Sequence, residues 1–141
     1  MPDSGKLVYS LGSMTMMMMT GKVLVVDDEQ DNLDLVERTL HFMGYEVAKA
    51  HSGPEALALL PEFHPNVVIL DVMMPGMSGL EVLKKINKTY ADPPPVILFT
   101  VRDDLKEIDD ALKAGAFSYL VKPSTIEKLL AAVQEAIASR Q

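Results

Sequence analysis

Cysteine is absent from the 141-residue chain, and this absence excludes disulfides, zinc sites with cysteine ligands and a cysteine nucleophile. The chain also lacks any apolar run approaching the roughly 20 residues that a membrane-spanning helix needs. Basic residues are few, because 13 Lys and Arg face 20 Asp and Glu for a net charge of −7. A nucleic-acid-binding domain usually carries a basic surface. The charge therefore favours a cation or a basic partner over nucleic acid.

Two phosphate-binding motifs are missing as well. The sequence contains neither GxGxxG nor GxxxxGK followed by Ser or Thr, so dinucleotide-binding and P-loop proteins are excluded. The histidines His41, His51 and His64 fall in separate segments without the spacing of metal ligands, and we expect them to have surface or packing roles. What remains is a composition near the average of soluble globular domains, with 48% hydrophobic and 23% charged residues.

Residues 1–20 are predicted to be a flexible tail outside the folded domain. They hold six of the ten methionines, four of them consecutive at 16–19. A signal peptide is excluded, because Ser10, Gly12 and Ser13 interrupt the apolar stretch and no small-residue cleavage site follows. Gly12-Ser13-Met14 resembles a cloning junction, so we expect residues 1–13 to come from a cloning vector and Met14–Thr20 to be a short natural leader. The alternative is a natural flexible tail.

From residue 21 to 141 the sequence alternates between short apolar runs and helical patterns. Continuous apolar, β-branched runs predict strands buried on both faces, and helical spacing of apolar residues predicts the helices between them. The predicted strands are 23–26, 45–48, 67–70, 96–99 and 117–121, and the predicted helices are 31–43, one capped by Ser52 that runs to about residue 60, 80–90, 104–114 and one capped by Ser124. Five such pairs predict a single doubly wound α/β domain, with a parallel sheet and helices on both faces.

Polar side chains end four of these strands. Asp27 and Asp28 follow the first strand, Asp71 the third, Thr100 the fourth and Lys122 the fifth. In open parallel sheets, ligands bind beyond the carboxyl ends of the strands. If these strands are neighbours, three carboxylates, a hydroxyl and an ammonium converge, with a net charge of −2 that one divalent cation cancels. Magnesium prefers such oxygen ligands, and a carboxylate beside it is a competent nucleophile for phosphorus, giving an aspartyl phosphate.

Each of these residues also has an ordinary structural interpretation. Asp27 and Asp28 could be acids at a helix N-terminus, where the helix dipole favours them. Asp71 could open a turn, Thr100 could be an edge hydroxyl, and Lys122 could be a solvated charge. Taken singly, the ordinary interpretation is the better one for each residue. Their joint occurrence at the strand ends of one repeating architecture favours a shared site instead.

Four segments carry a resemblance to a known family: VLVVDDE at 23–29, VVILDVMMPGMSGLEVL at 67–83, VILFT at 96–100 and GAFSYLVKP at 115–123. They resemble the receiver domain of two-component response regulators, of which the chemotaxis regulator is the best-known member. The resemblance covers residues 22 to about 139. It implies a flavodoxin-like (βα)5 fold with strand order 2-1-3-4-5, an order that the local sequence pattern does not establish.

The resemblance implies a chemical role for each matching residue. Asp71 would accept a phosphoryl group from a phosphohistidine on a sensor histidine kinase or a phosphotransfer protein. Asp27, Asp28, Asp71 and the backbone carbonyl of Met73 would bind Mg2+, for which Mn2+ can substitute. Lys122 would contact the phosphoryl group. The domain would thus be no enzyme beyond its own Mg-dependent phosphorylation and dephosphorylation.

The same resemblance implies a conformational switch. Thr100 would hydrogen-bond the phosphoryl group, and Tyr119 would be the aromatic residue that turns inward when the threonine moves. Lys122-Pro123 would be a cis peptide bond. The face built from the fourth helix, fifth strand and fifth helix would change and be selected by a partner. Val101, where the family often has alanine or glycine, is expected to shield the acyl phosphate and slow its loss.

The expected partners are a kinase or phosphotransfer protein upstream and a target protein or output domain downstream. We expect a cytoplasmic protein without direct contact to nucleic acid or membrane, and a homodimer that forms on phosphorylation is one expected assembly. The chain ends soon after the last predicted helix, which is expected either of a stand-alone regulator or of a receiver taken from a longer protein.

Two other functions remain open at this point. Haloacid-dehalogenase-type phosphatases also use an aspartyl nucleophile, a hydroxyl, a lysine and magnesium, but they generally need a second Asp two residues after the nucleophile, where this chain has Met73. Their acidic pair also comes late in the chain, whereas Asp27-Asp28 comes first. A receiver-like interaction module that is never phosphorylated is the second alternative, and the intact set of strand-end residues disfavours it.

Overall fold

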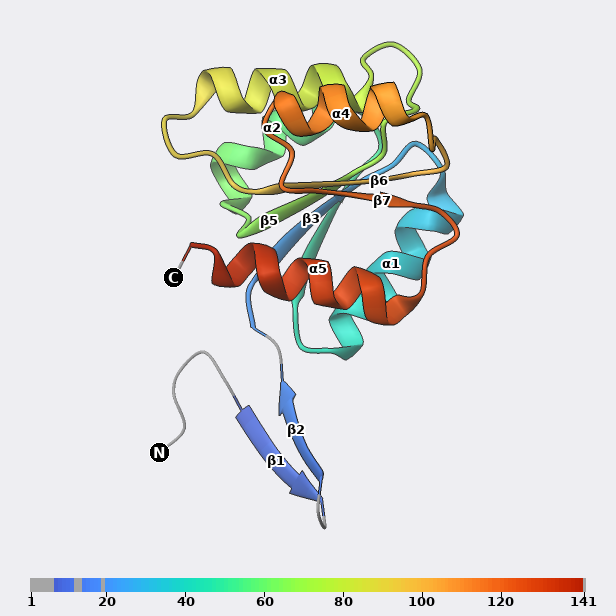
Figure 1. Ribbon diagram of the computed structural model, residues 1–141. Coiled ribbons are helices and arrows are strands. Elements are labelled where there is room, and N and C mark those ends of the chain that lie inside the picture. The colour runs from blue at the N-terminus through green and yellow to red at the C-terminus, as the bar shows by residue number, and fades with distance from the viewer. Residues whose placement is uncertain (1–6, 12–13, 19, 141) are drawn as a thin grey trace.

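The computed structural model describes residues 7–11, 14–18 and 20–140, and Figure 1 shows the arrangement of its elements. The strands are β1 (Leu7–Leu11), β2 (Met14–Met18), β3 (Lys22–Val26), β4 (Glu46–Ala50), β5 (Val67–Leu70), β6 (Val96–Thr100) and β7 (Ser118–Val121). The helices are α1 (Gln30–Phe42), α2 (Gly53–Phe63), α3 (Gly79–Thr89), α4 (Leu105–Lys113) and α5 (Ile126–Ala138). Within these described segments, no helix is both long and apolar enough to cross a membrane.

Strands β3 to β7 form a parallel five-stranded sheet in the order β4-β3-β5-β6-β7. Because β3 is the first strand of this sheet along the chain, the observed order is the expected 2-1-3-4-5, and the predicted fold is confirmed. Helices α2, α3 and α4 cover one face of the sheet, and α1 and α5 cover the other (Figure 1). The strands thus lie between two helical layers, and their carboxyl ends meet along one edge.

The sheet is buried on both faces, which explains the continuous apolar runs in its strands. In β3, Leu24 and Val26 pack beneath α2 and α3, whereas Val23 and Val25 pack against α1 and α5, because successive side chains of a strand point to opposite faces. None of these four side chains is more than 2% exposed. Burying one such aliphatic side chain contributes about 1.5–3 kcal/mol, so the strands form a well-packed base for the residues at their ends.

The N-cap of α2 agrees with the prediction, whereas the end of α2 and the N-cap of α5 differ from it. Ser52 accepts a hydrogen bond from the Glu55 backbone at 3.2 Å, as predicted. Helix α2 runs on through Pro61 to Phe63, beyond the predicted end, although Pro61 has no N–H to donate to an intrahelical hydrogen bond. The prediction of Ser124 as the last N-cap is wrong. Thr125 is the cap and accepts from the Lys128 backbone at 3.1 Å, because its extended backbone directly precedes the first helical residue.

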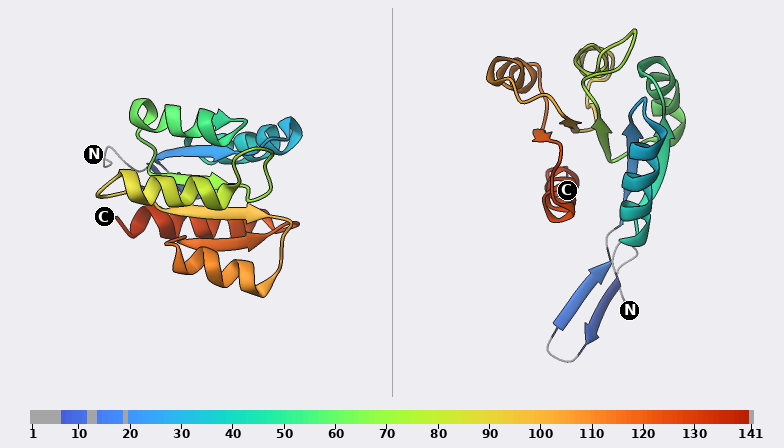
Figure 2. Two further views of the ribbon diagram at one scale, coloured as in Figure 1. Left: turned by 90° about the horizontal axis from the view of Figure 1, so that it is seen from above. Right: turned by 90° about the vertical axis from the view of Figure 1, so that its right-hand side faces the viewer.

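Strands β1 and β2 form an antiparallel hairpin that the sequence did not predict. Leu7 pairs with Met18 and Leu11 with Met14 in a two-stranded sheet of their own. Figure 2 shows this hairpin beyond the end of the domain at which β3 begins. Residues 1–6, 12–13 and 19 lie outside the described segments. The cloning-vector origin of residues 1–13 and the natural leader at 14–20 stay predictions.

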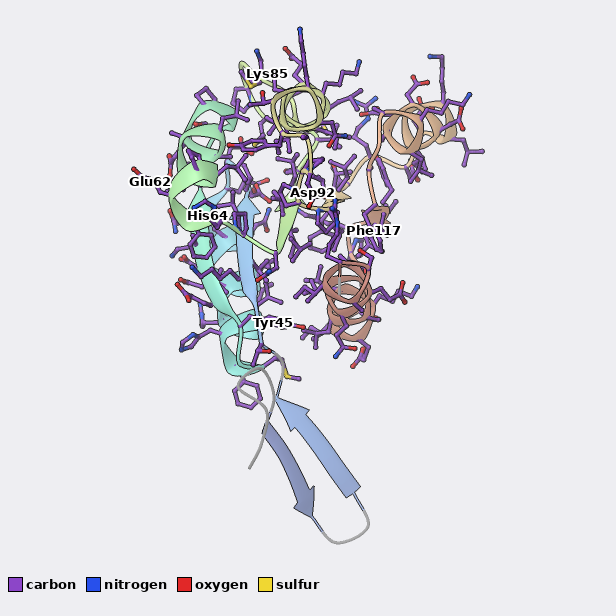
Figure 3. The ribbon with its side chains drawn as sticks, turned by 90° about the vertical axis from the view of Figure 1, so that its left-hand side faces the viewer. Tyr45, Glu62, His64, Lys85, Asp92 and Phe117 are labelled. Atoms are coloured by element: carbon purple, nitrogen blue, oxygen red, sulfur yellow. The ribbon has the colours of Figure 1, made fainter. Side chains whose placement is uncertain are left out.

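Tyr45 provides a test of packing by pH. It lies at the end of the domain nearest the hairpin (Figure 3), is 2% exposed, and burial raises its pKa to about 12 from 10.0. Because the folded-state pKa is the higher one, the unfolded chain releases this proton first, and stability present below about pH 10 is lost as the pH rises towards about 12. In Tyr45→Phe this loss is absent.

The measurement is urea unfolding of both proteins at several pH values between about 8 and 12. We expect the wild type to lose up to about 1.4 kcal/mol more per pH unit than Tyr45→Phe within the window. Lysines and other tyrosines titrate equally in the two proteins and cancel in the difference. Equal pH slopes would show that Tyr45 ionises as readily in the folded protein as in the unfolded one.

Candidate functional site

The candidate site lies at the carboxyl ends of the parallel strands. Asp27 follows β3, Asp71 follows β5, Thr100 ends β6 and Lys122 follows β7. Backbone hydrogen bonds continue the sheet past the strand ends: Asp71 N–H donates to the Val26 carbonyl at 3.0 Å, and Lys122 N–H donates to the Thr100 carbonyl at 2.7 Å. The sheet itself therefore sets the spacing of these side chains, as the sequence pattern predicted.

Three carboxylates converge at this edge. One oxygen from each of Asp27, Asp28 and Asp71 lies within 4.8 Å of the others. Asp27 and Asp71 are buried, at 5% and 7% exposure, whereas Asp28 is exposed. Asp27 is held in place by the Glu29 backbone N–H at 3.0 Å and by the Asn32 side-chain amide at 3.3 Å. These two contacts fix the orientation of the Asp27 carboxylate.

Lys122 is the cation of the site. Its Nζ lies 2.8 Å from Asp27 Oδ2 and 3.8 Å from Asp71 Oδ2, and its side chain is 15% exposed. The ammonium also lies 5.2 Å from the centre of the Phe99 ring. One ammonium against three carboxylates leaves two uncompensated negative charges. A further cation would therefore be electrostatically favourable at this site.

The donor set fits magnesium. All three side-chain donors are carboxylate oxygens, the ligand type that Mg2+ prefers, and the exposed Asp28 leaves access for the waters that Mg2+ retains. Among the described residues, this is the one group of three or more acidic or histidine side chains close enough to share a metal ion. The Met73 backbone N–H donates to Asp71 Oδ1 at 3.1 Å. The metal-binding role of the Met73 carbonyl stays a prediction.

Burial raises the pKa of Asp71 above its ordinary value. Hydrogen bonds from the Met73 backbone and the Thr100 side chain lower this pKa, as does the charge of Lys122, and the charge of Asp27 raises it further. The raised pKa means that the buried carboxylate is destabilised where it stands. A cation bound beside Asp71 would relieve that electrostatic cost.

Of the two predicted switch residues, Thr100 lies beside Asp71, and Tyr119 contacts the loop that follows Thr100. Thr100 is fully buried, and its Oγ1 accepts a hydrogen bond from the Arg102 backbone at 3.4 Å. The Tyr119 hydroxyl donates to the Arg102 carbonyl at 2.9 Å. The Lys122-Pro123 peptide bond is cis, as the resemblance implied. Val101 is 62% exposed directly after Thr100.

Two residues of the site escaped sequence analysis. Gly79 packs its backbone against the end of β5, where an added Cβ would lie 2.1 Å from the Asp71 carbonyl oxygen. The predicted helix begins at residue 80, whereas the capping box of Ser78 and Glu81 starts α3 at Gly79. Asn32 is the other, and its position five residues after Asp27 carried no signal. His51 and His64 are not part of the cluster.

A family model and a curated relative match this chain. The model of the response regulator receiver domain matches residues 23–134. The response regulator MprA of Mycobacterium tuberculosis (strain ATCC 25618 / H37Rv) is 42% identical over 113 residues, which are 80% of this chain and 49% of that protein. This chain therefore spans about half the length of the curated relatives that it matches.

Solved structures agree in fold and sequence. A response regulator receiver domain protein from Clostridium thermocellum is 38% identical with a TM-score of 0.79, covering 84% of this chain and 95% of the other. The DrrB receiver domain, described as BeF3-activated, is 35% identical with a TM-score of 0.75, covering 85% of this chain and 99% of the other. The chain therefore belongs to the family of response regulator receiver domains, which act in two-component signalling.

Proposed function

We propose that this chain is a phosphorylation-activated switch that accepts a phosphoryl group on Asp71 in a Mg2+-dependent reaction. The donor is a sensor histidine kinase or a phosphotransfer protein. The observation that carries the proposal is the buried Asp71 carboxylate, with Asp27 and Asp28 within 4.8 Å and the Lys122 ammonium at 3.8 Å. This arrangement combines a nucleophile, a metal-binding pair and a cation for the transferred group.

The chemistry follows from these positions. A carboxylate oxygen of Asp71 attacks the phosphorus atom, the bond from phosphorus to the donor nitrogen breaks, and the group remains on Asp71 as an acyl phosphate. Lys122 and the Thr100 hydroxyl are placed to stabilise charge on the phosphoryl oxygens. Asp27 and Asp28 would hold Mg2+, which would supply a further positive charge for the same oxygens. The domain needs no other catalytic group, so we do not propose that it is an enzyme acting on other substrates.

The acyl phosphate then alters the switch residues. Phosphorylation adds negative charge and acceptor oxygens at the sheet edge, so Thr100 and Lys122 gain a new partner. Tyr119, which bonds to the loop after Thr100, responds to that change. We propose that the face formed by α4, β7 and α5 is then selected by a downstream protein or output domain, as in two-state switches generally. A phosphorylation-dependent homodimer is one form of that response.

The proposed function also implies where the protein acts and what it contacts. A kinase-dependent switch of this kind acts in the cytoplasm, and the acidic charge of −7 disfavours direct contact of this domain with nucleic acid. The BeF3-activated state described for the DrrB receiver domain supports the use of beryllofluoride as a phosphoryl mimic here.

Intact-mass measurement after incubation with acetyl phosphate and Mg2+ tests the proposal. Wild type is expected to gain the mass of one phosphoryl group, and Asp71→Asn to gain none, because the amide is no nucleophile for phosphorus. Asp109→Asn is the matched control, since Asp109 pairs with Lys113 on the surface of α4, and it should be phosphorylated like wild type. Chelation of Mg2+ should abolish the gain.

Other outcomes of this experiment favour the alternatives. Hydrolysis of a phosphomonoester with turnover would indicate a haloacid-dehalogenase-type phosphatase. Absence of any mass gain in wild type, together with no binding of beryllofluoride, would indicate an interaction module that is not phosphorylated.

Val101 is expected to lengthen the life of the acyl phosphate. Its side chain follows Thr100 and is large enough to restrict the approach of water to the phosphoryl group. Val101→Ala should therefore lose the group several-fold faster in a time course of intact mass after removal of the donor. Leu105→Ala, which also truncates an exposed apolar side chain near this loop, serves as the control. An unchanged lifetime of the acyl phosphate in Val101→Ala would show that Val101 does not protect it from water.

A further inference from the structure

Arg102 lies at the junction of three parts of the molecule. Its backbone N–H donates to the Thr100 hydroxyl oxygen at 3.4 Å, and its backbone carbonyl accepts from the Tyr119 hydroxyl at 2.9 Å. Its guanidinium forms an ion pair with Glu107 on α4, with Nη2 at 2.6 Å from Oε2. One residue thus contacts the proposed phosphoryl-sensing hydroxyl, the aromatic residue of β7 and the helix beyond.

The Arg102–Glu107 ion pair is less exposed to solvent than the other two ion pairs of α4. The Glu107 side chain is 19% exposed, whereas the carboxylates of Asp110 and Asp109 are 48% and 59% exposed in their pairs with Lys106 and Lys113. Those two pairs join residues of the same helix, so they do not tie α4 to anything else. Only the Arg102–Glu107 pair, among these three, links α4 to the loop that follows Thr100.

This ion pair also faces the loop that follows Asp71. Arg102 and Glu107 line a groove of about 460 Å³ together with Met73, Pro75 and Ser78 from the loop after Asp71. The groove is therefore bounded on one side by the segment that carries the proposed phosphorylation site and on the other by the ion pair. A shift of the Thr100 loop changes the position of Arg102 relative to both sides.

We propose that Arg102 is a positioning residue, which through its ion pair with Glu107 holds the Thr100 hydroxyl and helix α4 in the arrangement without a phosphoryl group. This inference rests on the proposed function. For Thr100 to follow a phosphoryl group on Asp71, the loop must move, and the Arg102 backbone moves with it. The Glu107 pair opposes that movement. Breaking the pair therefore lowers the cost of the movement and favours binding of a phosphoryl mimic.

The test is titration of the full chain with beryllofluoride in excess Mg2+. Glu107→Gln is expected to bind beryllofluoride roughly fivefold more tightly than wild type, the range expected for coupling through one partly exposed ion pair. Asp110→Asn is the matched control, because it removes the same charge from α4 and breaks the Lys106–Asp110 pair, and its affinity should equal that of wild type. Exchanging the charges in Arg102→Glu with Glu107→Arg should restore wild-type affinity.

A second measurement follows Thr100 without any phosphoryl mimic. The Thr100 methyl resonance, from a fully buried side chain, should shift in Glu107→Gln and in Arg102→Gln but not in Asp110→Asn. A merely structural role of the ion pair would leave this resonance and the beryllofluoride affinity unchanged. Equal affinities in Glu107→Gln and Asp110→Asn, or an unshifted Thr100 resonance, would overturn the proposal.

The two proposals fail in different ways. If wild type does not bind beryllofluoride, the proposed function fails, and the Thr100 resonance alone decides whether Arg102 positions the hydroxyl. If wild type binds it and Glu107→Gln binds it no more tightly, phosphorylation of Asp71 stands and the positioning role of Arg102 fails.

Discussion

Gly79→Ala is expected to lower the free energy of unfolding by roughly 3 kcal/mol and to abolish phosphorylation of Asp71. An added Cβ would lie 2.1 Å from the Asp71 carbonyl oxygen and 2.8 Å from Val72 Cα. Both neighbours are backbone atoms that cannot rotate away. The Gly79 N–H also donates to the Val72 carbonyl at 2.9 Å. Helix α3 must therefore move away from the end of β5 and carry the segment beside the nucleophile with it.

Gly76→Ala separates this steric effect from backbone conformation. Gly76 has a φ of +81° and no atom within 4 Å of an added Cβ, so alanine there suffers only the cost of a left-handed backbone, about 1–2 kcal/mol. Urea unfolding and intact mass after acetyl phosphate treatment compare the two variants. Gly76→Ala should still be phosphorylated. If Gly79→Ala is as stable and as well phosphorylated as Gly76→Ala, the predicted clash between a Cβ at position 79 and the Asp71 carbonyl oxygen is refuted.

Lys122→Met should be the second most damaging substitution, with a loss of about 3 kcal/mol in the absence of Mg2+. Methionine retains the length of the apolar stem but leaves the buried Asp27 and Asp71 carboxylates, at 5% and 7% exposure, without their ammonium. Mg2+ should recover part of this loss, because a divalent cation compensates the same charges. Phosphorylation from acetyl phosphate should still slow by roughly 100-fold, since one stabilising group for the transition state is missing.

Urea unfolding with and without Mg2+ measures both effects of Lys122→Met. Lys49→Met is the matched control, because Lys49 pairs with Asp34 at 3.3 Å and Glu37 at 3.0 Å on the partly exposed side of β4. Surface pairs of this kind contribute about 0–1 kcal/mol, and the change should not depend on Mg2+. A Lys122→Met protein whose stability and Mg2+ response match those of Lys49→Met would refute the charge balance proposed for the site.

Much of the site could be predicted because it depends on local patterns. Short apolar runs located the strands, and the first polar residue after four of the five runs is a residue of the site. A parallel sheet brings these ends together whatever the details of packing. The order of the strands came from the family resemblance, since a local pattern contains no information on which strands are neighbours. The three carboxylates and Lys122 follow from the pattern once that order is known.

What escaped prediction depends on contacts between distant segments or on single atoms. The need for glycine at position 79 arises from the Asp71 carbonyl, which only the folded chain brings near it. The hydrogen bond from Tyr119 to Arg102 joins strand β7 to the loop after β6, and its formation depends on the Tyr119 rotamer. Ser124 and Thr125 are adjacent hydroxyl residues with similar capping preference, so the sequence could not choose between them. The β1–β2 hairpin escaped prediction because its strands lack a regular alternation of apolar and polar residues.

The contact between Lys122 and Asp27 also has a consequence for the order of folding. It joins residues 95 positions apart, and the intervening chain must form its strands and helices before the two meet. Closing so long a segment costs chain entropy that only the completed sheet repays. We therefore expect the Lys122–Asp27 ion pair to form last, after β7 has paired with β6. The three carboxylates, which follow β3 and β5, then come together before the ammonium that offsets part of their charge reaches them.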